Sequence, residues 1–421
     1  MKKKILIKGP ILTRSGYGEQ TRFLTRSLRS RPDLFDLYIH PLEWGQTSWM
    51  SEDNEERIWI DQMIEKTIAH AQQNLGFDGS IQVTIPNEWQ KIAPINIGYT
   101  AGIESTKVAH EWLIKSNDMD RVIVISNHAK QGLTETKYSA TNNTTGQTMD
   151  ILLNTPVDVV NYPVKIYESA PELSLDLDYD FNFLTVAQMG PRKNIINTIK
   201  WFVEEFRNEE VGLVLKSNIA KNCVSDRETQ MAHFRGMLSS MGEHKCKIYL
   251  LHGDMTDEEM HALYVHPKIK SFLLLTHGEG FGLPTFEAIY SGLPVITTGW
   301  SGQLDFLIDD ETGEDVFFNV AFDIQPIQQE AVWDGVLVKD SMWAFPREKS
   351  ARYQMRRCYD SLTGKDAKKT IKRCAEYSEK VKNNFSTEKQ YSEMVESVCV
   401  GLGIGPGEIA SSPQANEVLS F

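Results

Sequence analysis

The chain has 421 residues, a length that suits two or three domains of ordinary size. It is 41% hydrophobic and 24% charged, as in soluble globular enzymes, and no apolar run reaches the ~18–20 residues of a membrane span. The net charge of −13 argues against a protein that mainly binds nucleic acid. The five cysteines are odd in number and form no CxxC pair, so we expect free thiols in a reducing cytoplasm.

The first part of the chain alternates between short apolar runs and helical patterns. The N-terminal MKKKILIKGP favours a strand over a signal peptide, because Lys8 interrupts the apolar run after three residues. Alternation of strands and helices predicts a parallel sheet covered on both faces. The polar residues 143–150 are expected to form a loop. The expected strands are 5–7, 37–40, 81–85, 95–99 and 121–126, and the expected helices lie near 18–30, 55–75, 106–116 and 128–138.

A second alternating set follows a linker candidate at 163–180, which has two prolines, many acids and no periodic pattern. Its strands are expected at 181–187, 211–216, 247–251, 271–276 and 294–298, and residues 347–398 are helical. We therefore predict two doubly wound α/β domains, 1–165 and 181–385, facing a central cleft. A helix at 386–400 is expected to pack back on the first domain, and residues 401–421 to form a flexible tail.

The stretch THGEGFGLPTFEAIYSGLPVITTGW, residues 276–300, combines a glycine loop with a helix start and two glutamates. Pro284 suits the beginning of a helix and Gly292 its end. Free N–H groups at a helix start bind phosphate or sugar oxygens, and carboxylates accept hydrogen bonds from paired hydroxyls. We expect Glu287 in the first helical turn and Glu279 in the loop, both facing one ligand. The alternative is a capped helix with two solvated glutamates.

The run HGEGFGLPTFEAIYSGLPVITTGWSGQLDFL resembles the nucleotide-sugar signature of the retaining glycosyltransferases of family four, with its E-x7-E spacing. The resemblance implies the GT-B fold of two Rossmann-like domains. It places Glu279 near the donor sugar and Glu287 on the ribose of the nucleotide. It also implies donor contacts from the intervening loop and from an acid where the family has glutamate; these residues are Gly280, Phe281, Gly282, Leu283 and Asp305.

The family also places two basic residues on the diphosphate, from loops that follow strands of the second domain. In this sequence VAQMGPRKN offers Arg192 and Lys193, and VLKSN offers Lys216. Both clusters follow predicted strand ends, where ligands bind in such sheets. We expect Lys193 and Lys216 to act with Glu279 in catalysis and Arg192 to bind the donor. The alternative for each is a solvated surface charge.

The first domain carries weaker signals. ILIKGPILTRSGYGEQTRFL resembles the family's N-terminal loop, which implies donor contacts at Gly16 and Gly18; a tight strand–helix turn would need the same glycines. Strand ends also carry Asn87, Glu104 and His128, which we assign to the acceptor side. Ser126 is expected to cap the helix that contains His128, and a histidine there can equally be a surface residue.

The expected function is retaining transfer of a sugar from a nucleotide diphosphate sugar to an acceptor hydroxyl, most simply that of a sugar or glycan. No His, Cys or Asp spacing suggests a metal site, so we expect no metal and no cofactor beyond the donor. The sequence predicts a cytoplasmic location and leaves the donor and the oligomeric state open.

Three alternatives remain open. One is transfer to hydroxymethylated bases in DNA, as in viral enzymes of this fold, motivated by nine Lys and Arg against the single acid Glu19 in residues 1–31. Another is a catalytically silent GT-B partner subunit that only binds nucleotide. The last is a sugar epimerase of the same fold, which would make two products from nucleotide sugar alone.

Overall fold

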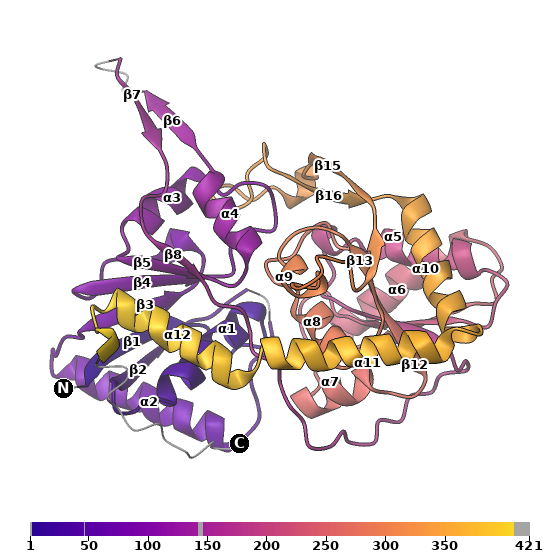
Figure 1. The fold of residues 1–421 in the computed structure, drawn as a ribbon, viewed down its shortest axis with the longest axis horizontal. Coiled ribbons are helices and arrows are strands. Elements are labelled where there is room, and N and C mark those ends of the chain that lie inside the picture. The colour runs from indigo at the N-terminus through magenta and orange to yellow at the C-terminus, as the bar shows by residue number, and fades with distance from the viewer. Residues whose placement is uncertain (1, 46, 142–145, 408–421) are drawn as a thin grey trace. The chain divides into compact units, whose positions relative to one another are not determined.

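The fold is described from a computed structural model, which covers residues 2–45, 47–141 and 146–407. The chain divides into two compact units. Unit 1 comprises the chain up to Pro163, Trp333–Val338 and the residues from Phe385 on; unit 2 comprises Val164–Val332 and Lys339–Asn384. Each unit has the doubly wound α/β architecture that the alternating pattern predicts (Figure 1).

Unit 1 is built on a six-stranded parallel sheet of order β2-β1-β3-β4-β5-β8. Ile5, Ile7, Ile81 and Ile97 on its central strands are fully buried, as expected for a sheet covered on both faces. The strands are β1 (Lys3–Gly9), β2 (Phe35–Pro41), β3 (Gly79–Val83), β4 (Ile95–Thr100), β5 (Arg121–Val124) and β8 (Val157–Val159). The helices are α1 (Gly16–Arg29), α2 (Glu55–Gln72), η1 (Pro86–Glu88), α3 (His110–Asn117), α4 (Asn127–Glu135) and α12 (Thr387–Gly401).

An antiparallel hairpin, β6 (Tyr138–Thr141) with β7 (Thr148–Ile151), projects from unit 1. It corrects the loop expected at 143–150, because Thr148 to Asp150 pair with β6; residues 143–145 of that loop lie outside the described residues. The strand was missed because it has only four residues, the first three of them exposed, and a run this short gives little pattern to recognise.

Two segments distant in sequence complete unit 1. Helix α12 packs on α1, where the rings of Phe23 and Tyr391 lie 6.1 Å apart, and Figure 1 shows it alongside the unit 1 sheet. Trp333–Val338 forms a tight turn whose Val336 is buried in a cluster with Trp89 and Trp112. We call Trp333–Val338 the clip. Past α12, Leu402 and Ile404 are also buried, and residues 408–421 of the expected tail lie outside the described residues.

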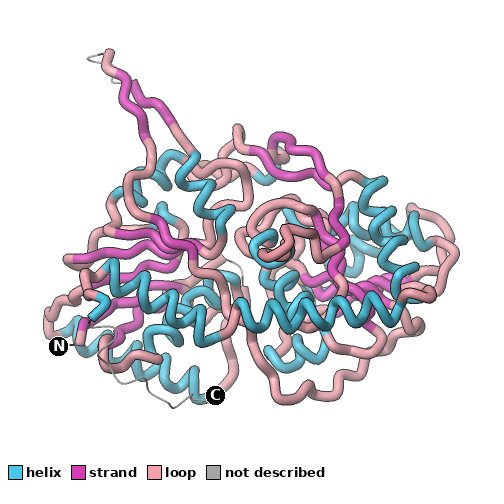
Figure 2. Tube along the Cα trace, in the orientation of Figure 1, coloured by secondary structure: helices cyan, strands magenta, loops and turns pink. Residues whose placement is uncertain are grey.

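Unit 2 has a second six-stranded parallel sheet, of order β11-β10-β9-β12-β13-β14. Its strands are β9 (Asn182–Val186), β10 (Gly212–Lys216), β11 (Lys247–Leu251), β12 (Ile269–Leu274), β13 (Val295–Thr298) and β14 (Phe318–Val320). The helices are η2 (Pro191–Lys193), α5 (Ile195–Phe206), α6 (Val224–Ser240), α7 (Asp257–Tyr264), α8 (Leu283–Tyr290), α9 (Leu304–Leu307), η3 (Gln329–Ala331), α10 (Glu348–Thr363) and α11 (Ala367–Asn384). Figure 2 shows helices covering this sheet.

A two-stranded antiparallel ribbon, β15 (Phe322–Pro326) with β16 (Met342–Pro346), also belongs to unit 2. Arg356 of α10 pairs with Glu205 of α5 at 2.8 Å and with Glu209, just after α5, at 2.6 Å. The N-cap of α7 is Thr256, which forms a capping box with Glu259, so Asp257 is the first helical residue.

Candidate functional site

The strand order of unit 2 brings two loops together. β9 lies between β10 and β12, so the chain runs outward in one direction after β9 and in the other after β12. Ligands of such sheets bind beyond the carboxyl ends of the strands at this switch point. The loops that leave it are 187–194, after β9, and 275–282, after β12. These two loops carry Arg192, Lys193 and Glu279.

Glu279 is the centre of a buried ion cluster. Its carboxylate accepts from Lys193 Nζ at 2.6 Å and from Arg192 Nη1 at 3.0 Å, and its side chain is only 6% exposed. Burial alone would raise the pKa of Glu279, but the nearby Lys193 and Arg192 charges outweigh it and lower the pKa to about 2. The carboxylate is therefore ionised at neutral pH, and two cations lie beside it at the switch point.

The two loops are joined by main-chain contacts as well. The Arg192 guanidinium donates to the Gly278 carbonyl at 2.6 Å, and the His277 N–H donates to the Arg192 carbonyl at 2.8 Å. His277 is buried against the β15–β16 ribbon: its Nδ1 lies 2.7 Å from the Ala344 carbonyl and its ring stacks on Trp343. Burial lowers the pKa of His277, which favours the neutral ring. The ribbon thus supports the loop that carries Glu279.

Glu279 is also held through its main chain by the turn after β13. Its N–H donates to Ser301 Oγ at 2.8 Å, and its carbonyl accepts from the Gly302 N–H at 3.0 Å. The neighbouring Gln303 is fully buried and donates from Nε2 to the Thr298 carbonyl at 2.7 Å. Three loops, after β9, β12 and β13, therefore determine where the Glu279 carboxylate lies.

Helix α8 begins directly after the glycine loop. Gly282 is its N-cap at φ +95°, a left-handed conformation that favours glycine, and Pro284 is the second helical residue. The helix leaves its first N–H groups without intrahelical carbonyl partners, those of Leu283 and Thr285 among them. Phe281 is 2% exposed and packs on Phe286 and Phe306, so its side chain is part of the core and only its main chain is suited to a ligand contact.

Glu287 is the fifth residue of α8 and therefore lies in the second turn, one turn later than the sequence suggested. The helix starts at Leu283 because residue 282 still has the left-handed conformation of a cap. The Glu287 carboxylate accepts from the Tyr264 hydroxyl of α7 at 2.9 Å. Burial, reinforced by this carboxylate, raises the pKa of Tyr264 well above its ordinary value, so the tyrosine remains a donor.

Lys216 and Asp305 have other surroundings. Lys216, at the end of β10, donates to the Gly253 carbonyl in the loop after β11, a contact unlike that of Lys193 with Glu279. Asp305 lies in the short helix α9, where its N–H donates to the Gly302 carbonyl at 3.3 Å. Gly280, between Glu279 and Phe281, is buried in the glycine loop. The structure brings Glu279, Lys193 and Arg192 together, and it ties Lys216 to a neighbouring loop.

Asp226 is a buried charge that sequence reasoning missed. Its carboxylate accepts from the N–H groups of residues 219, 220 and 221 at 2.7–2.9 Å and lies 2.9 Å from His252 Nε2. Burial would raise the pKa of Asp226, but these donors lower it to about 2. Asp226 thereby orders the loop after β10, which in turn binds Gln188 and Met189 of the β9 loop. Asp226 could not be recognised from the sequence, because it lies ten residues after the end of the predicted strand and belongs to no motif.

The family model described as glycosyl transferases group 1 matches residues 177–321. The matched span contains β9 to β14, the Glu279 cluster and α8. This region is a group 1 glycosyl transferase domain. No curated protein matches the sequence.

Solved structures resemble the whole chain at low identity. A sucrose-phosphate synthase from Thermosynechococcus elongatus has a TM-score of 0.60 at 13% identity, covering 96% of this chain and 100% of that one. HepE from Anabaena, solved with UDP and glucose, has a TM-score of 0.58 at 12% identity, covering 94% and 100%. The catalytic domain of starch synthase IV from Arabidopsis thaliana, solved with ADP and acarbose, has 0.57 at 11%, covering 96% and 99%. The chain therefore has the GT-B fold, and the glycosyl transferase domain is its second Rossmann-like domain.

Unit 1, which lies outside the matched glycosyl transferase domain, has its own cluster of strand-end residues. The Tyr17 hydroxyl lies 2.7 Å from Thr100 Oγ1. Burial raises the pKa of Tyr17, and the nearby Glu104 and Glu88 charges add to the increase. Gly18 is in close contact, since an added Cβ would lie 2.0 Å from the Thr13 carbonyl oxygen, whereas nothing lies within 4 Å of one on Gly16. The two glycines therefore have different structural roles.

The other acceptor-side candidates of unit 1 are placed as follows. His128 is the second residue of α4, which Ser126 caps as expected, and burial lowers the pKa of His128 to about 4. The Asn87 amide nitrogen donates to the Gly335 carbonyl of the clip at 2.8 Å. Asn87 thus holds the clip in place, a role that no sequence pattern indicates because the two residues are 248 apart.

The basic residues that begin the chain are engaged within unit 1. Arg22 is 8% exposed and donates to the carbonyls of Ile11 and Thr13, which makes it a structural residue. The arginines of residues 1–31 have these partners: Glu52 for Arg14, Glu19 for Arg22, Glu56 and Glu19 for Arg26, Asp33 for Arg31 and the ring of Trp59 for Arg29. Four of the nine basic residues in this stretch, all of them arginines, are therefore paired with acids from the same unit.

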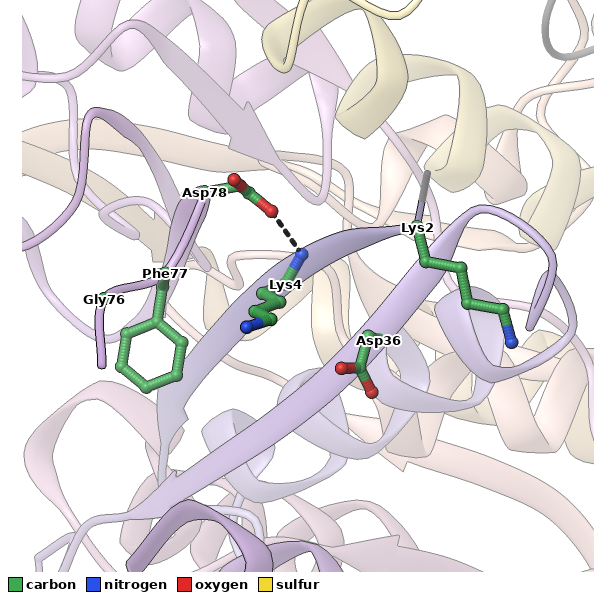
Figure 3. A pocket seen from close by; sticks show the side chains of 6 residues that line it. All are labelled: Lys2, Lys4, Asp36, Gly76, Phe77 and Asp78. Atoms are coloured by element: carbon green, nitrogen blue, oxygen red, sulfur yellow. Dashed lines mark hydrogen bonds between the residues drawn. The ribbon is translucent and has the colours of Figure 1, made fainter. Parts of the chain in front are cut away.

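A pocket also lies at the amino ends of the unit 1 strands (Figure 3). Its lining includes Asp78, which accepts from the Lys4 N–H at 2.7 Å, and Asp36, which accepts from Lys66 Nζ at 2.5 Å. Parallel α/β sheets bind ligands at the opposite edge. Both carboxylates of this pocket have structural partners, and we assign it no function.

Among the described residues, no group of three or more His, Cys, Asp or Glu is arranged to hold a metal ion. In the same part of the chain, no helix combines the length and the apolar character needed to cross a membrane.

Proposed function

We propose that this protein is a retaining glycosyltransferase that moves a sugar from a nucleotide diphosphate sugar to an acceptor hydroxyl. The observation that carries the proposal is the buried Glu279 cluster with Lys193 and Arg192, located at the switch point of a group 1 glycosyl transferase domain and followed directly by the start of α8.

The chemistry of the cluster fits a diphosphate leaving group. Negative charge on the diphosphate grows as the glycosidic bond breaks, and cations and helix-start N–H groups placed beforehand stabilise it. Lys193 and Arg192 supply the cations, while Leu283 begins the helix that supplies the N–H groups. Glu279 holds both cations in place, and its remaining acceptor capacity is suited to a sugar hydroxyl.

Glu287 is proposed to bind the ribose of the nucleotide. A carboxylate oxygen accepts more than one hydrogen bond, so the contact from Tyr264 leaves capacity for ribose hydroxyls. The Tyr264 hydroxyl orients the carboxylate from behind. Two solved structures of the same fold, HepE and starch synthase IV, were obtained with UDP and with ADP, which supports a nucleoside diphosphate as the donor's leaving group.

We propose that transfer retains the anomeric configuration and needs no metal. Same-face attack, in which the leaving phosphate oxygen helps to remove the acceptor proton, requires no side-chain nucleophile. Positive charge comes from Lys193 and Arg192, and Lys216 is proposed to assist from the next loop. Addition of EDTA should therefore leave turnover unchanged, and a loss that Mg²⁺ restores would contradict this part of the proposal.

A sugar or glycan hydroxyl is the proposed acceptor. Four arginines of the N-terminal stretch are paired with acids of unit 1, which weakens the observation that favoured DNA. The intact ion cluster also disfavours a silent partner subunit, because a module that only binds nucleotide has no need for a buried carboxylate between two cations.

The experiment is a thermal-shift screen of nucleotide sugars followed by mass analysis of products with candidate glycans. We expect one donor to raise the melting temperature and to yield a product larger by one sugar. Transfer to a duplex that carries hydroxymethylcytosine would favour the DNA alternative. Two nucleotide sugars formed without acceptor would favour an epimerase, and binding without any turnover would favour the silent subunit.

A further inference from the structure

Three non-glycine residues of the described chain have a left-handed backbone: Asn74 at φ +52°, Asn194 at +53° and Ser301 at +75°. This conformation is unfavourable for residues with a side chain and persists only where the surroundings impose it. Asn74 follows the C-cap of α2, where a left-handed residue commonly ends a helix, and it is exposed. The other two end no α-helix, and both contact the loops of the Glu279 cluster.

Ser301 makes contacts that a glycine could not make. Its hydroxyl accepts from the Glu279 N–H at 2.8 Å and donates to the Trp300 carbonyl at 2.6 Å, and the residue is 5% exposed. Glycine would adopt the same backbone without strain but has no oxygen to offer. The strained serine therefore ties the main chain of Glu279 to the turn after β13.

Asn194 also connects two loops of the cluster through its side chain. It directly follows Lys193, and its Nδ2 donates to the Leu275 carbonyl at 3.0 Å while its Oδ1 accepts from Asn197 at 2.7 Å. The residue is 7% exposed. Its side chain thus ties the loop that carries the two cations to the loop that carries Glu279.

We propose that Asn194 and Ser301 are positioning residues. Their side chains hold the two cations and Glu279 in the correct relative positions, and this role explains why non-glycine residues occupy a strained backbone conformation. The inference rests on the proposed function, in which these three charged groups act on the donor. Neither residue needs to touch the donor. The strained residues lie in the loops that position Lys193, Arg192 and Glu279. A glycine at either position would relieve the strain but would lose the side-chain hydrogen bonds that hold these loops together.

The test compares S301G, S301A, N194G and N194A with N74G as the matched control. Turnover is measured with the nucleotide sugar found in the screen, stability by thermal unfolding, and the geometry of the cluster by the rate of Lys193 reductive methylation, followed by mass spectrometry. We expect S301G to be more stable than S301A, because glycine removes the strain. Both should nevertheless lose turnover on the order of 10- to 100-fold, as misplaced catalytic groups do.

N194G should lose turnover in the same way, whereas N74G should keep it. Lys193 should react faster in S301G and N194G than in the wild type, and at the wild-type rate in N74G. Wild-type turnover together with wild-type Lys193 reactivity in S301G and N194G would overturn the inference. If the wild type turns over no nucleotide sugar, the proposed function fails, and the Lys193 rates alone then decide the positioning role. If an alanine variant does not fold, the glycine variant at the same position is compared with the wild type instead.

Discussion

Glu279 lies between two cations at the carboxyl edge of a sheet, and its surroundings determine both its charge and its response to acid. Burial disfavours the ionised form, but Lys193 and Arg192 outweigh burial, so the carboxylate stays charged. Glu287 lies in a different setting, at the second turn of α8 with the Tyr264 hydroxyl as partner. The two glutamates therefore lie in separate surroundings, so the role proposed for each can be tested alone.

The Glu279 cluster should make stability depend on pH at the acid end. The pKa of Glu279 is about 2 in the folded protein, against an ordinary value of 4.5. A depressed pKa contributes stability that is fully present above pH 4.5 and is lost as pH falls through about 2. We expect E279Q to lose less stability than the wild type between these values, by on the order of 2 kcal/mol, in urea unfolding at several pH values. The exposed E258Q serves as the control, and parallel curves for wild type and E279Q would contradict the account.

Glu287 should matter for nucleotide affinity. We expect E287A to weaken binding of the nucleoside diphosphate by roughly 1–3 kcal/mol in calorimetry, because the ribose hydroxyls lose a charged acceptor. Y264F keeps the carboxylate and removes only the hydroxyl that orients it, so its loss should be smaller. Equal losses in the two variants would mean that Glu287 acts only by holding Tyr264.

At the scale of elements, the start of α1 shows how two neighbouring glycines differ. Ser15 caps the helix by accepting from the Gly18 N–H, and Gly18 packs against the Thr13 carbonyl. Gly16 has open space around it. Close packing therefore requires glycine at position 18 but not at position 16.

This difference predicts opposite results for two alanine variants. G18A places a Cβ against a backbone oxygen and should lose about 1–3 kcal/mol in chemical unfolding. G16A reduces the freedom of the unfolded chain and should be neutral or stabilising by about 0.4–1 kcal/mol. If G16A keeps its stability but loses donor affinity, the family's assignment of this loop to the donor gains support. Equal stability of the two variants would show that the close contact at Gly18 is relieved by a shift of the loop.

The sequence was sufficient for elements whose signals are local. Apolar runs located five strands of each sheet but not the short edge strands β8 and β14. Pro284 and Gly292 marked the region of α8, because turn and cap residues act within a few positions. It could not assign Arg192 to Glu279, since an 87-residue separation says nothing about a pair until the strand order is known. It missed Asp226 and Ser301 for the same reason: a buried carboxylate and a left-handed serine are recognised by their neighbours in space.

At the scale of the molecule, neither unit is a continuous piece of chain. The clip and α12 belong to unit 1, although both follow most of unit 2 in sequence. Val336 inserts into the Trp89 and Trp112 cluster, and Asn87 binds Gly335, which has φ +73°. No local pattern predicts that the clip belongs to unit 1, because its sequence, WDGVL, is typical of an ordinary loop.

The clip should contribute to the stability of unit 1. V336A removes two buried methyl groups and should cost about 1–3 kcal/mol in urea unfolding, with faster proteolytic cleavage near residues 333–338. V400A is the control, because Val400 is half exposed on α12. A V336A protein with unchanged stability and unchanged cleavage would show that the clip is not held by its packing.

The proposed function requires that the group 1 glycosyl transferase domain act on a nucleotide diphosphate sugar through Glu279. The most direct measurement is release of nucleoside diphosphate from the donor identified in the screen, with and without acceptor, by wild type, E279A and E258Q. We predict release and sugar transfer by wild type and E258Q, with E279A losing turnover more than it loses affinity for the nucleoside diphosphate. Release by none of the proteins from any nucleotide sugar, or an E279A variant as active as the wild type, would contradict the account.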